Sequence, residues 1–461
     1  PFFLDCLKSV IHTGSWSRGL TELIVRKGAY EDRTPASRTM FERAKRVEPA
    51  GVSYKNRYFE PYPFFVKKSR GANVIDLDEN VYTDYWCTHM AMILGHAYPT
   101  VMEAIKRQAE NGWHHGFVHE LEVAYSEAIV RNVPSAELVR HASSGSEANF
   151  FAVRLARTFT KRSKIAKFEG GWQGAYDPLH IAMKPPFDKL PSGGITKGSQ
   201  QDTIVVPFND FDGFEDRVKH EQLACVILEP VLFAGGCIPA DREFVKAIRE
   251  YCDSTGTLLV FDEIITGFRL GLDGAQGYYK VQPDLTVLGK IIGGGLPIGA
   301  ICGRRDVMER MDHTRYSGLD YAYHGNTFSG NAITLAAGLA TINVLERFPV
   351  YEHIDKLGNI AREGMNRIFE DAGFPAQAVG VGSIFCIHMT NKPLKDISGF
   401  THYDHAQYKR MFNFLLENGI VILLPEILHG GVSYAHTEND IKHLTGTIEE
   451  YVKSTSRHVG T

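Results

Sequence analysis

The feature that most constrains the fold of this chain is a set of six short apolar runs. Each run is followed by a stretch with helical spacing. The runs are LVRHA, KIAKF, TIVVPF, ACVILEP, LLVFDE and LTVLGK, between residues 138 and 290. Short buried strands that alternate with helices are typical of an α/β domain, because the crossover helices cover the faces of a parallel sheet. We therefore expect an α/β fold with a mainly parallel sheet.

The residues that follow these runs carry reactive or ligand-binding groups. The runs lead into SSGSEAN at 143–149, Trp172, Glu229, Asp262 and Lys290. In open α/β sheets, ligands bind in a crevice at the carboxyl ends of the strands. We expect these five sites to face one crevice.

The types of residue at these strand ends match the needs of pyridoxal 5'-phosphate (PLP). A partly desolvated lysine such as Lys290 attacks a carbonyl. A carboxylate such as Asp262 keeps a pyridine nitrogen protonated, so that the ring acts as an electron sink. The helix start at 144–146 offers N–H groups to a phosphate, and Trp172 offers an aromatic face.

Longer segments carry a family resemblance. LLVFDEIITGFR, followed by LGKIIGGGLPIGAICGR, resembles the signature of the class III (fold type I) aminotransferases, and the 28-residue step from Asp262 to Lys290 fits it. The segments HGNTFSGN and YAHTENDI are also similar, and the resemblance extends from about residue 40 to 450. Within the family, the chain is most similar to the glutamate-1-semialdehyde 2,1-aminomutases.

The resemblance implies a role for each matching residue in a PLP enzyme. Lys290 would be the lysine that bonds to the cofactor aldehyde and carries the proton, and Asp262 would pair with the ring nitrogen. The remaining expected cofactor contacts are Ser144, Gly145 and Ser146 at the phosphate, Trp172 on the ring, Glu229 in the crevice with an open role, and Thr327 of the neighbouring subunit.

The resemblance also implies the architecture and the substrate class. We expect a homodimer of fold type I, with a large PLP-binding domain at 86–344 and a small α+β domain from segments 1–85 and 345–461. Arg57, in GVSYKNR, stands where the aminomutase has an arginine proposed to bind the substrate carboxylate. The substrate would be a small amino acid or a similar compound.

Other positions depart from the aminomutase pattern while the cofactor residues are kept. The departures surround the expected substrate position: Gln173 after Trp172, Ala234, Tyr54, His89, Leu428 and the rewritten loop 177–200. The sequence therefore predicts aminomutase-like amino-group transfer, with a β- or ω-amino acid transaminase as the alternative. A non-catalytic PLP-binding oligomeric protein is a more distant one.

Each of these residues also has a plain structural interpretation. Lys290 and Arg57 could be solvated surface side chains, and Trp172 could belong to the core. Asp262 or Glu263 could cap a helix, and SSGSE forms a capping box. Arg269 could pair with a carboxylate.

A metal site is not expected. His115 and His119 lie four residues apart and could share a helix face, but no third ligand accompanies them. HGFVHELEVAYSEAI favours a helix near the cofactor or the subunit interface.

Composition excludes several other classes of protein. The formal net charge of −4 does not favour a nucleic-acid partner, and no apolar run approaches the ~20 residues that span a membrane. Seven cysteines without a CxxC pair indicate reduced thiols and a cytoplasmic location. The start of the chain lacks a signal-peptide pattern.

Overall fold

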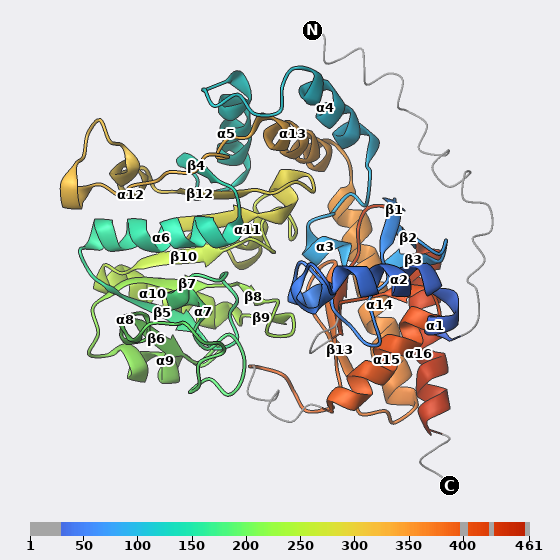
Figure 1. Cartoon of the computed structure of the whole chain (residues 1–461). Coiled ribbons are helices and arrows are strands. Elements are labelled where there is room, and N and C mark those ends of the chain that lie inside the picture. Colours follow the sequence, from blue (N-terminus) through green and yellow to red (C-terminus); the bar gives the residue numbers. More distant parts are fainter. Residues whose placement is uncertain (1–28, 397–403, 424–427, 457–461) are drawn as a thin grey trace.

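The computed structural model describes residues 29–396, 404–423 and 428–456. Cys6 and the N-terminal segment examined for a signal peptide lie outside these ranges. The described chain has two parts (Figure 1): an α/β part built from the middle of the sequence, and a second part in which the N-terminal and C-terminal segments lie side by side.

The α/β part is built on a mainly parallel sheet. Among the described residues it has seven strands, and every neighbouring pair is parallel except those of β12, which runs antiparallel to β11 and β4. The strands in spatial order are β4 (Leu138–Ala142), β12 (Gly299–Gly303), β11 (Leu285–Gly289), β10 (Leu258–Asp262), β7 (Leu223–Leu228), β5 (Lys164–Phe168) and β6 (Thr203–Val206).

The six apolar runs form six of these strands, which confirms the predicted α/β class. The sequence pattern missed β12, whose residues GAICG are mostly small. Small residues are needed there, since a Cβ on Gly299 would lie 2.1 Å from the carbonyl oxygen of Ser144.

Alternating side chains of the central strands enter two separate hydrophobic cores. Ile227 and Val260 pack on the face covered by α6 (Gly145–Thr160), whereas Val226 and Leu259 belong to the core that includes α10 (Arg242–Thr255). Strands buried on both faces explain the continuous apolar runs. The other helices of this part are α4 (Pro99–Glu110), α5 (Glu120–Asn132), α7 (Asp177–His180), α8 (Lys197–Gln201), α9 (Phe211–Val218), α11 (Gly274–Tyr279), α12 (Arg305–Met308) and α13 (Ala332–Arg347).

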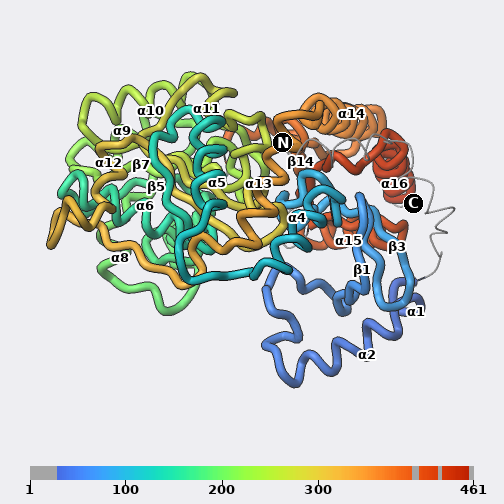
Figure 2. Tube along the Cα trace, turned by 90° about the horizontal axis from the view of Figure 1, so that it is seen from above, coloured from blue at the N-terminus to red at the C-terminus, as the bar shows by residue number. Residues whose placement is uncertain are grey.

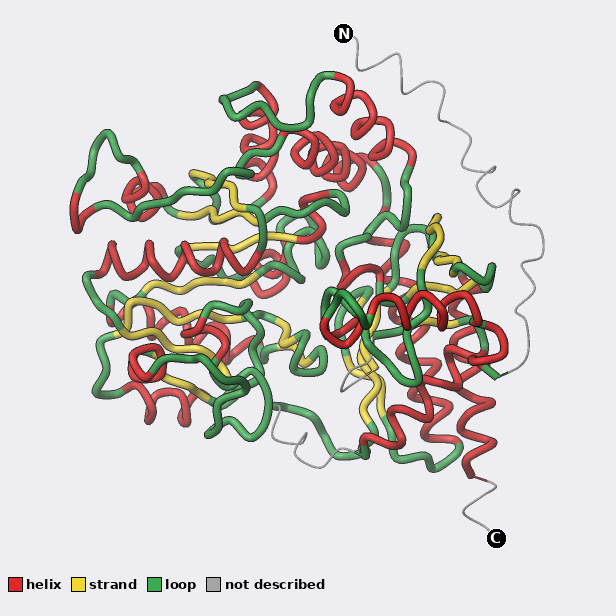
Figure 3. Tube along the Cα trace, in the orientation of Figure 1, coloured by secondary structure: helices red, strands yellow, loops and turns green. Residues whose placement is uncertain are grey.

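The second part combines two small sheets with helices from both ends of the described chain (Figure 3). Strands β1 (Val66–Arg70), β2 (Asn73–Asp76) and β3 (Val81–Asp84) form an antiparallel meander, and β15 (Ile420–Val421) pairs with β3 in parallel. The other sheet has β13 (Gln377–Val379), β14 (Ile384–His388) and β16 (Leu428–Gly431). The pairing of β3 with β15 joins segments that lie more than 300 residues apart in the sequence.

Long helices cover these small sheets and connect them to the α/β part. Helices α14 (Val350–Asp371) and α16 (Glu438–Ser456) pack against each other, and α15 (His405–Glu417) contacts α16. Figure 2 shows α14 and α16 together on one side of this part and α2 (Pro35–Ala44) on the other. Within the described residues no single helix has both the length and the apolarity to cross a membrane; α13 and α14 meet that measure only as a pair, across an 80° bend.

One glycine of α13 is required by close packing, which gives a stability test. A Cβ on Gly338 would lie 2.0 Å from the carbonyl oxygen of Ile292. That oxygen also accepts a hydrogen bond of 2.7 Å from the hydroxyl of Tyr125. We expect Gly338→Ala to lower the free energy of unfolding by about 1–3 kcal/mol, the usual cost of overpacking a core.

Gly446 in α16 provides the matched control, because a Cβ there would meet no atom within 4 Å. Gly446→Ala should raise the free energy of unfolding by about 0.5–1 kcal/mol, the usual gain in a helix interior. Urea denaturation of both variants measures the two values. Equal effects of the two substitutions would contradict the packing argument.

Candidate active site

Three charged side chains meet at the carboxyl edge of the central strands. Asp262 ends β10, Glu229 follows β7, and Lys290 follows β11. Strands β7, β10 and β11 are adjacent and parallel, so their carboxyl ends lie side by side. The charges of Asp262 and Glu229 both act to raise the pKa of Lys290, as expected for neighbouring groups.

The carboxylate of Asp262 is buried and held by two hydrogen bonds. Oδ2 accepts 2.7 Å from Nδ2 of Asn149, and Oδ1 accepts 3.0 Å from the backbone N–H of Ile264. Burial raises the pKa of Asp262, while both hydrogen bonds and the charge of Lys290 act to lower it. These interactions favour the ionised form of the carboxyl group.

Glu263, the neighbour of Asp262, has a structural position instead. Its carboxylate is buried and accepts hydrogen bonds of 2.6 Å from the backbone N–H of Ala275, 3.0 Å from Gln276 and 3.1 Å from Thr266. Residues 264–268 form turns and no helix. The helix-cap interpretation of Asp262 or Glu263 is therefore wrong, although Asp262 does accept the N–H of Ile264.

Glu229 is a second buried carboxyl group with a different environment. Its Oε1 accepts 2.5 Å from the backbone N–H of Trp172 and 2.8 Å from Nε2 of Gln173. Burial and the charge of Asp262 raise the pKa of Glu229, which favours its protonated form. Two buried carboxyl groups thus lie close enough for the charge of one to affect the pKa of the other.

Lys290 begins a short 3-10 helix, Lys290–Gly293, in the left-handed region with φ of 51°. This conformation is uncommon for a residue other than glycine and is found often at functional sites. Burial lowers the pKa of Lys290, and the charges of Asp262 and Glu229 oppose that shift. A lowered pKa increases the fraction of the neutral, nucleophilic amine.

Two buried side chains of this region were missed by the sequence analysis. Asn149 donates its Nδ2 to both Asp262 and the carbonyl oxygen of Gln173. Lys167 donates 2.9 Å to the carbonyl oxygen of Gly171 and 2.5 Å to that of Ile181, and burial lowers its pKa to about 7. A lysine inside the apolar run KIAKF, and an asparagine on the buried face of a helix, were the available signals.

The turn SSGS forms the N-terminus of α6. The hydroxyl of Ser144 accepts 3.2 Å from the N–H of Glu147, and Oε2 of Glu147 accepts 2.8 Å from the N–H of Ser143. A capping interaction is thus present, as the alternative interpretation expected. A Cβ on Gly145 would lie 2.3 Å from Ile264, and one on Gly174 would lie 2.3 Å from the hydroxyl of Ser146, so backbone approaches closely on both sides of this turn.

Trp172 and Thr327 differ strongly in burial. Trp172 is partly buried and its ring packs edge-on against His180 at 5.4 Å. Thr327 is exposed in the loop before α13, next to Phe328, which is 60% exposed. The exposed position of Thr327 leaves it accessible to another molecule.

A left-handed turn brings His89 to the same region. Four consecutive residues, Cys87–Met90, have φ between 47° and 68°, at a cost of about 1–2 kcal/mol for each residue other than glycine. Hydrogen bonds hold the turn in place: Oδ1 of Asp84 accepts the N–H groups of Trp86 and Cys87, and the carbonyl oxygen of Met90 accepts 2.7 Å from Arg269.

The hydrogen bonds of Arg269 correct one expectation. Its buried guanidinium donates to the carbonyl oxygens of Met90 and Val432 and to the hydroxyl of Ser383, not to a carboxylate. Arg269 therefore connects the strained turn to the residue that precedes β14 and the residue that follows β16.

Two residues of the expected substrate position, Arg57 and Tyr54, lie near His89. The charges of Lys290 and Arg57 both act to lower the pKa of His89, and the ring of Tyr54 lies 6.1 Å from its ring. Arg57 is exposed and donates 2.8 Å to the hydroxyl of Ser53. Ala234 is also exposed, whereas Leu428 is fully buried in β16. Loop 177–200 contains the single turn α7 and the start of α8.

The histidine pair considered for a metal does not share a helix face. Helix α5 begins only at Glu120, and Nε2 of His119 lies 2.8 Å from the carbonyl oxygen of Gly330. The described residues contain no group of three potential metal-ligating side chains.

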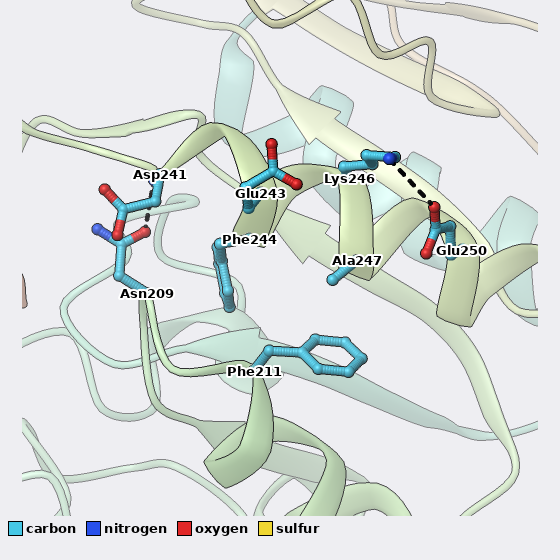
Figure 4. Close-up of a pocket in the computed structure, with 8 residues that line it drawn as sticks. All are labelled: Asn209, Phe211, Asp241, Glu243, Phe244, Lys246, Ala247 and Glu250. Carbon is cyan, nitrogen blue, oxygen red and sulfur yellow. Dashed lines mark hydrogen bonds and ion pairs between the residues drawn. The ribbon is translucent and has the colours of Figure 1, made fainter.

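A hollow of about 410 Å³ lies between α9 and α10 (Figure 4), away from the predicted site residues. It is lined by Asn209, Phe211, Asp241, Glu243, Phe244, Lys246, Ala247 and Glu250.

The fold and this site define a class of enzyme, and comparison with known proteins identifies the family. The chain belongs to the class III aminotransferases, whose model matches residues 54–452. These are PLP-dependent enzymes of fold type I. It is 40% identical over 426 residues to the glutamate-1-semialdehyde 2,1-aminomutase of Methanopyrus kandleri, covering 91% of this chain and 98% of that one.

Two transaminases of known structure are also similar to this chain. An omega-transaminase from Sphaerobacter thermophilus is 33% identical with a TM-score of 0.87, covering 93% of this chain and all of that one. A beta-phenylalanine aminotransferase from Variovorax paradoxus is 30% identical with a TM-score of 0.83, covering 92% and 95%. The predicted family, fold and cofactor class are therefore confirmed.

The residues at the carboxyl edge fit PLP. The buried carboxylate of Asp262 matches a protonated ring nitrogen, and Lys290 lies near both Asp262 and His89 of the strained turn. Gly145 and Gly174 let Ile264 and Ser146 pack closely at the N-terminus of α6, where a helix leaves N–H groups without intrahelical partners. This donor set suits a phosphate.

The raised pKa of Glu229 predicts how stability depends on pH. A carboxyl group whose folded-state pKa is raised binds a proton that the unfolded chain releases above its ordinary pKa near 4.5. Its contribution to stability is complete below pH 4.5 and is lost as the pH rises through the folded-state pKa. We expect Glu229→Gln to remove this part of the decline, by up to about 1.4 kcal/mol per pH unit.

Urea unfolding of the purified protein and the variant at several pH values between 4.5 and 8 measures the difference. Exposed Glu243 supplies a control, Glu243→Gln, which should keep the slope of the unmodified protein. Parallel stability curves for the Glu229→Gln variant and the unmodified protein would contradict a raised pKa.

Proposed function

We propose that this chain catalyses PLP-dependent amino-group transfer on a small, carboxylate-bearing amino compound. The observation that supports it is the grouping of Lys290, Asp262 and Glu229 at the ends of three adjacent parallel strands. When bound, PLP supplies an electron sink for the substrate carbon that loses its proton. The side chains of the protein orient the cofactor and the substrate and transfer protons.

Each site residue has a role that follows from its environment. The carboxylate of Asp262, oriented by Asn149, would pair with the ring nitrogen of PLP. Lys290, with its lowered pKa, would hold the cofactor at its aldehyde and carry the substrate proton at its Nζ. The N–H groups of Gly145 and Ser146, with the hydroxyl of Ser144, would bind the phosphate.

The remaining cofactor residues act on the ring and its surroundings. Trp172 would pack on the ring of bound PLP and shield it from water. Glu229 lies beside Asp262, and its raised pKa favours the protonated form, which adds no second negative charge. This leaves the charge of Asp262 as the partner of the ring nitrogen.

The aminomutase reaction is the first candidate for the activity. The relatives of highest identity bear that name, and Arg57 stands where a guanidinium would bind a carboxylate through two hydrogen bonds. A β- or ω-amino acid transaminase is the second candidate. The departures at Tyr54, His89 and Ala234 and the similarity to an omega-transaminase support it.

One assay distinguishes the two candidates. We expect the PLP-loaded protein to convert glutamate-1-semialdehyde to 5-aminolevulinate without a second amino compound. Lys290→Ala should reduce the rate at least about a hundredfold, the scale of a lost general base, while Lys246→Ala, on an exposed lysine, should leave it unchanged. Absence of product, with amino transfer from a β- or ω-amino acid to an oxo acid, would establish the second candidate.

We also propose that the enzyme is a homodimer in which Thr327 completes the site of the neighbouring subunit. Large apolar side chains are exposed near this residue: Trp113, Phe117 and Val118 are 67%, 84% and 90% exposed. His114 packs on Phe328 at 5.4 Å, so this segment adjoins the loop of Thr327. Exposed apolar patches of this kind support a subunit interface.

A charged residue in the patch tests the dimer. We expect Val118→Asp to weaken self-association at least about tenfold, since burying an unpaired carboxylate is costly, and to lower activity in parallel. Sedimentation velocity over a range of concentrations measures the association. Val47→Asp, at a position that is 82% exposed and remote in sequence, is the control. A monomeric, fully active unmodified protein would refute the shared site.

The domain boundaries and the compartment belong to the same proposal. A large domain at 86–344, with a small domain from 1–85 and 345–461, is supported by the pairing of β3 with β15. A cytoplasmic location is supported by the six described cysteines, which are all buried and unpaired.

A further inference from the structure

Four buried polar atoms without a hydrogen-bond partner lie in side chains that adjoin one another near Lys290. They are Nε1 of Trp86, Nε2 of His89, and both ring nitrogens of His429. Buried polar groups are almost always paired, because an unpaired one loses its hydration without compensation. A cluster of unpaired groups therefore points to a ligand that pairs with them.

Trp86 and His89 belong to one turn, His429 comes from β16, and the three rings adjoin one another. The rings of Trp86 and His89 are 5.3 Å apart, and those of His89 and His429 are 6.3 Å apart. Phe233 packs on His429 at 4.5 Å and forms an apolar wall. His429 is only 5% exposed, so its single N–H depends on a bound acceptor for a partner.

The charges around this cluster favour an anion. Among the described residues, the charged groups that act on His89 are Lys290 and Arg57, and the titratable groups that act on His429 are His89 and His388. No acidic side chain is among them. The indole of Trp86 is a donor only, and each neutral imidazole has one N–H to donate.

The geometry points to a subsite, formed by Trp86, His89 and His429, that binds the carboxylate of the substrate from the buried side while Arg57 binds it from the exposed side. This inference rests on the proposed function, since it assigns the substrate carboxylate to particular donors. The strained turn Cys87–Met90 explains how His89 reaches this position. The subsite favours short amino acids whose carboxylate lies close to the reacting amine.

A simple carboxylate tests the subsite without turnover. Propionate is titrated into the PLP-loaded enzyme by isothermal calorimetry, with propionamide as an uncharged probe of the same shape. We expect propionate to bind at least tenfold more tightly than propionamide. His429→Phe keeps the ring and removes both nitrogens, and it should weaken propionate binding at least tenfold.

Two further variants make the result specific. Trp86→Phe removes one N–H donor and should weaken propionate binding severalfold, and it carries the test if His429→Phe does not fold. His220→Gln, on an exposed histidine, should leave binding unchanged. The absorbance of the bound cofactor confirms that each variant is loaded.

The outcomes separate this inference from the proposed function. Equal binding of propionate and propionamide, or full propionate affinity in the His429→Phe and Trp86→Phe variants, would overturn the subsite even if the enzyme transfers amino groups. Propionate binding that depends on His429, in an enzyme that transfers no amino group from any amino acid, would support the subsite and overturn the proposed function.

Discussion

The burial of the Asp262 carboxylate at the end of a central strand is the constraint on which the rest of the site depends. An ionised carboxylate in the interior needs hydrogen bonds and a positive partner. Asn149 and the N–H of Ile264 supply the hydrogen bonds, and Lys290 supplies the opposite charge. The same burial affects Glu229, because the charge of Asp262 helps to keep its neighbour protonated.

Backbone strain and unpaired polar groups occur together near Lys290. Lys290 and residues Cys87–Met90 all have positive φ, and Trp86, His89 and His429 have unpaired polar atoms. The structure maintains this arrangement through Asp84 and Arg269, whose hydrogen bonds fix both ends of the left-handed turn. Such concentration of unfavourable features is expected where a ligand binds.

The residues proposed to bind the cofactor and those proposed to bind the substrate are held in position by different parts of the fold. The proposed cofactor residues follow strands of one sheet, whose registers fix their relative positions. The proposed substrate residues Arg57, His89 and His429 come from three distant segments. This difference explains how one cofactor frame accommodates relatives named for an aminomutase and for transaminases.

The sequence by itself determined the α/β class, six of the strands and the candidate residues at their carboxyl ends. It could do so because buried strands are apolar along their whole length and the change to polar residues marks where each one ends. It missed β12, where small residues permit close approach to Ser144 and weaken the apolar signal. The family motifs named the cofactor and the residues expected to hold it.

Only the tertiary structure decided which polar side chains are buried and what they contact. Asn149 and Lys167 are ordinary residues in the sequence, and their importance arises from contacts with Asp262, Gly171 and Ile181. Glu263 proved structural and Arg269 binds carbonyl oxygens, although sequence allowed other interpretations of both. The cluster of Trp86, His89 and His429 joins residues more than 300 positions apart. Its polar atoms are unpaired because packing removes them from water without supplying a partner, and no local pattern in the sequence records that.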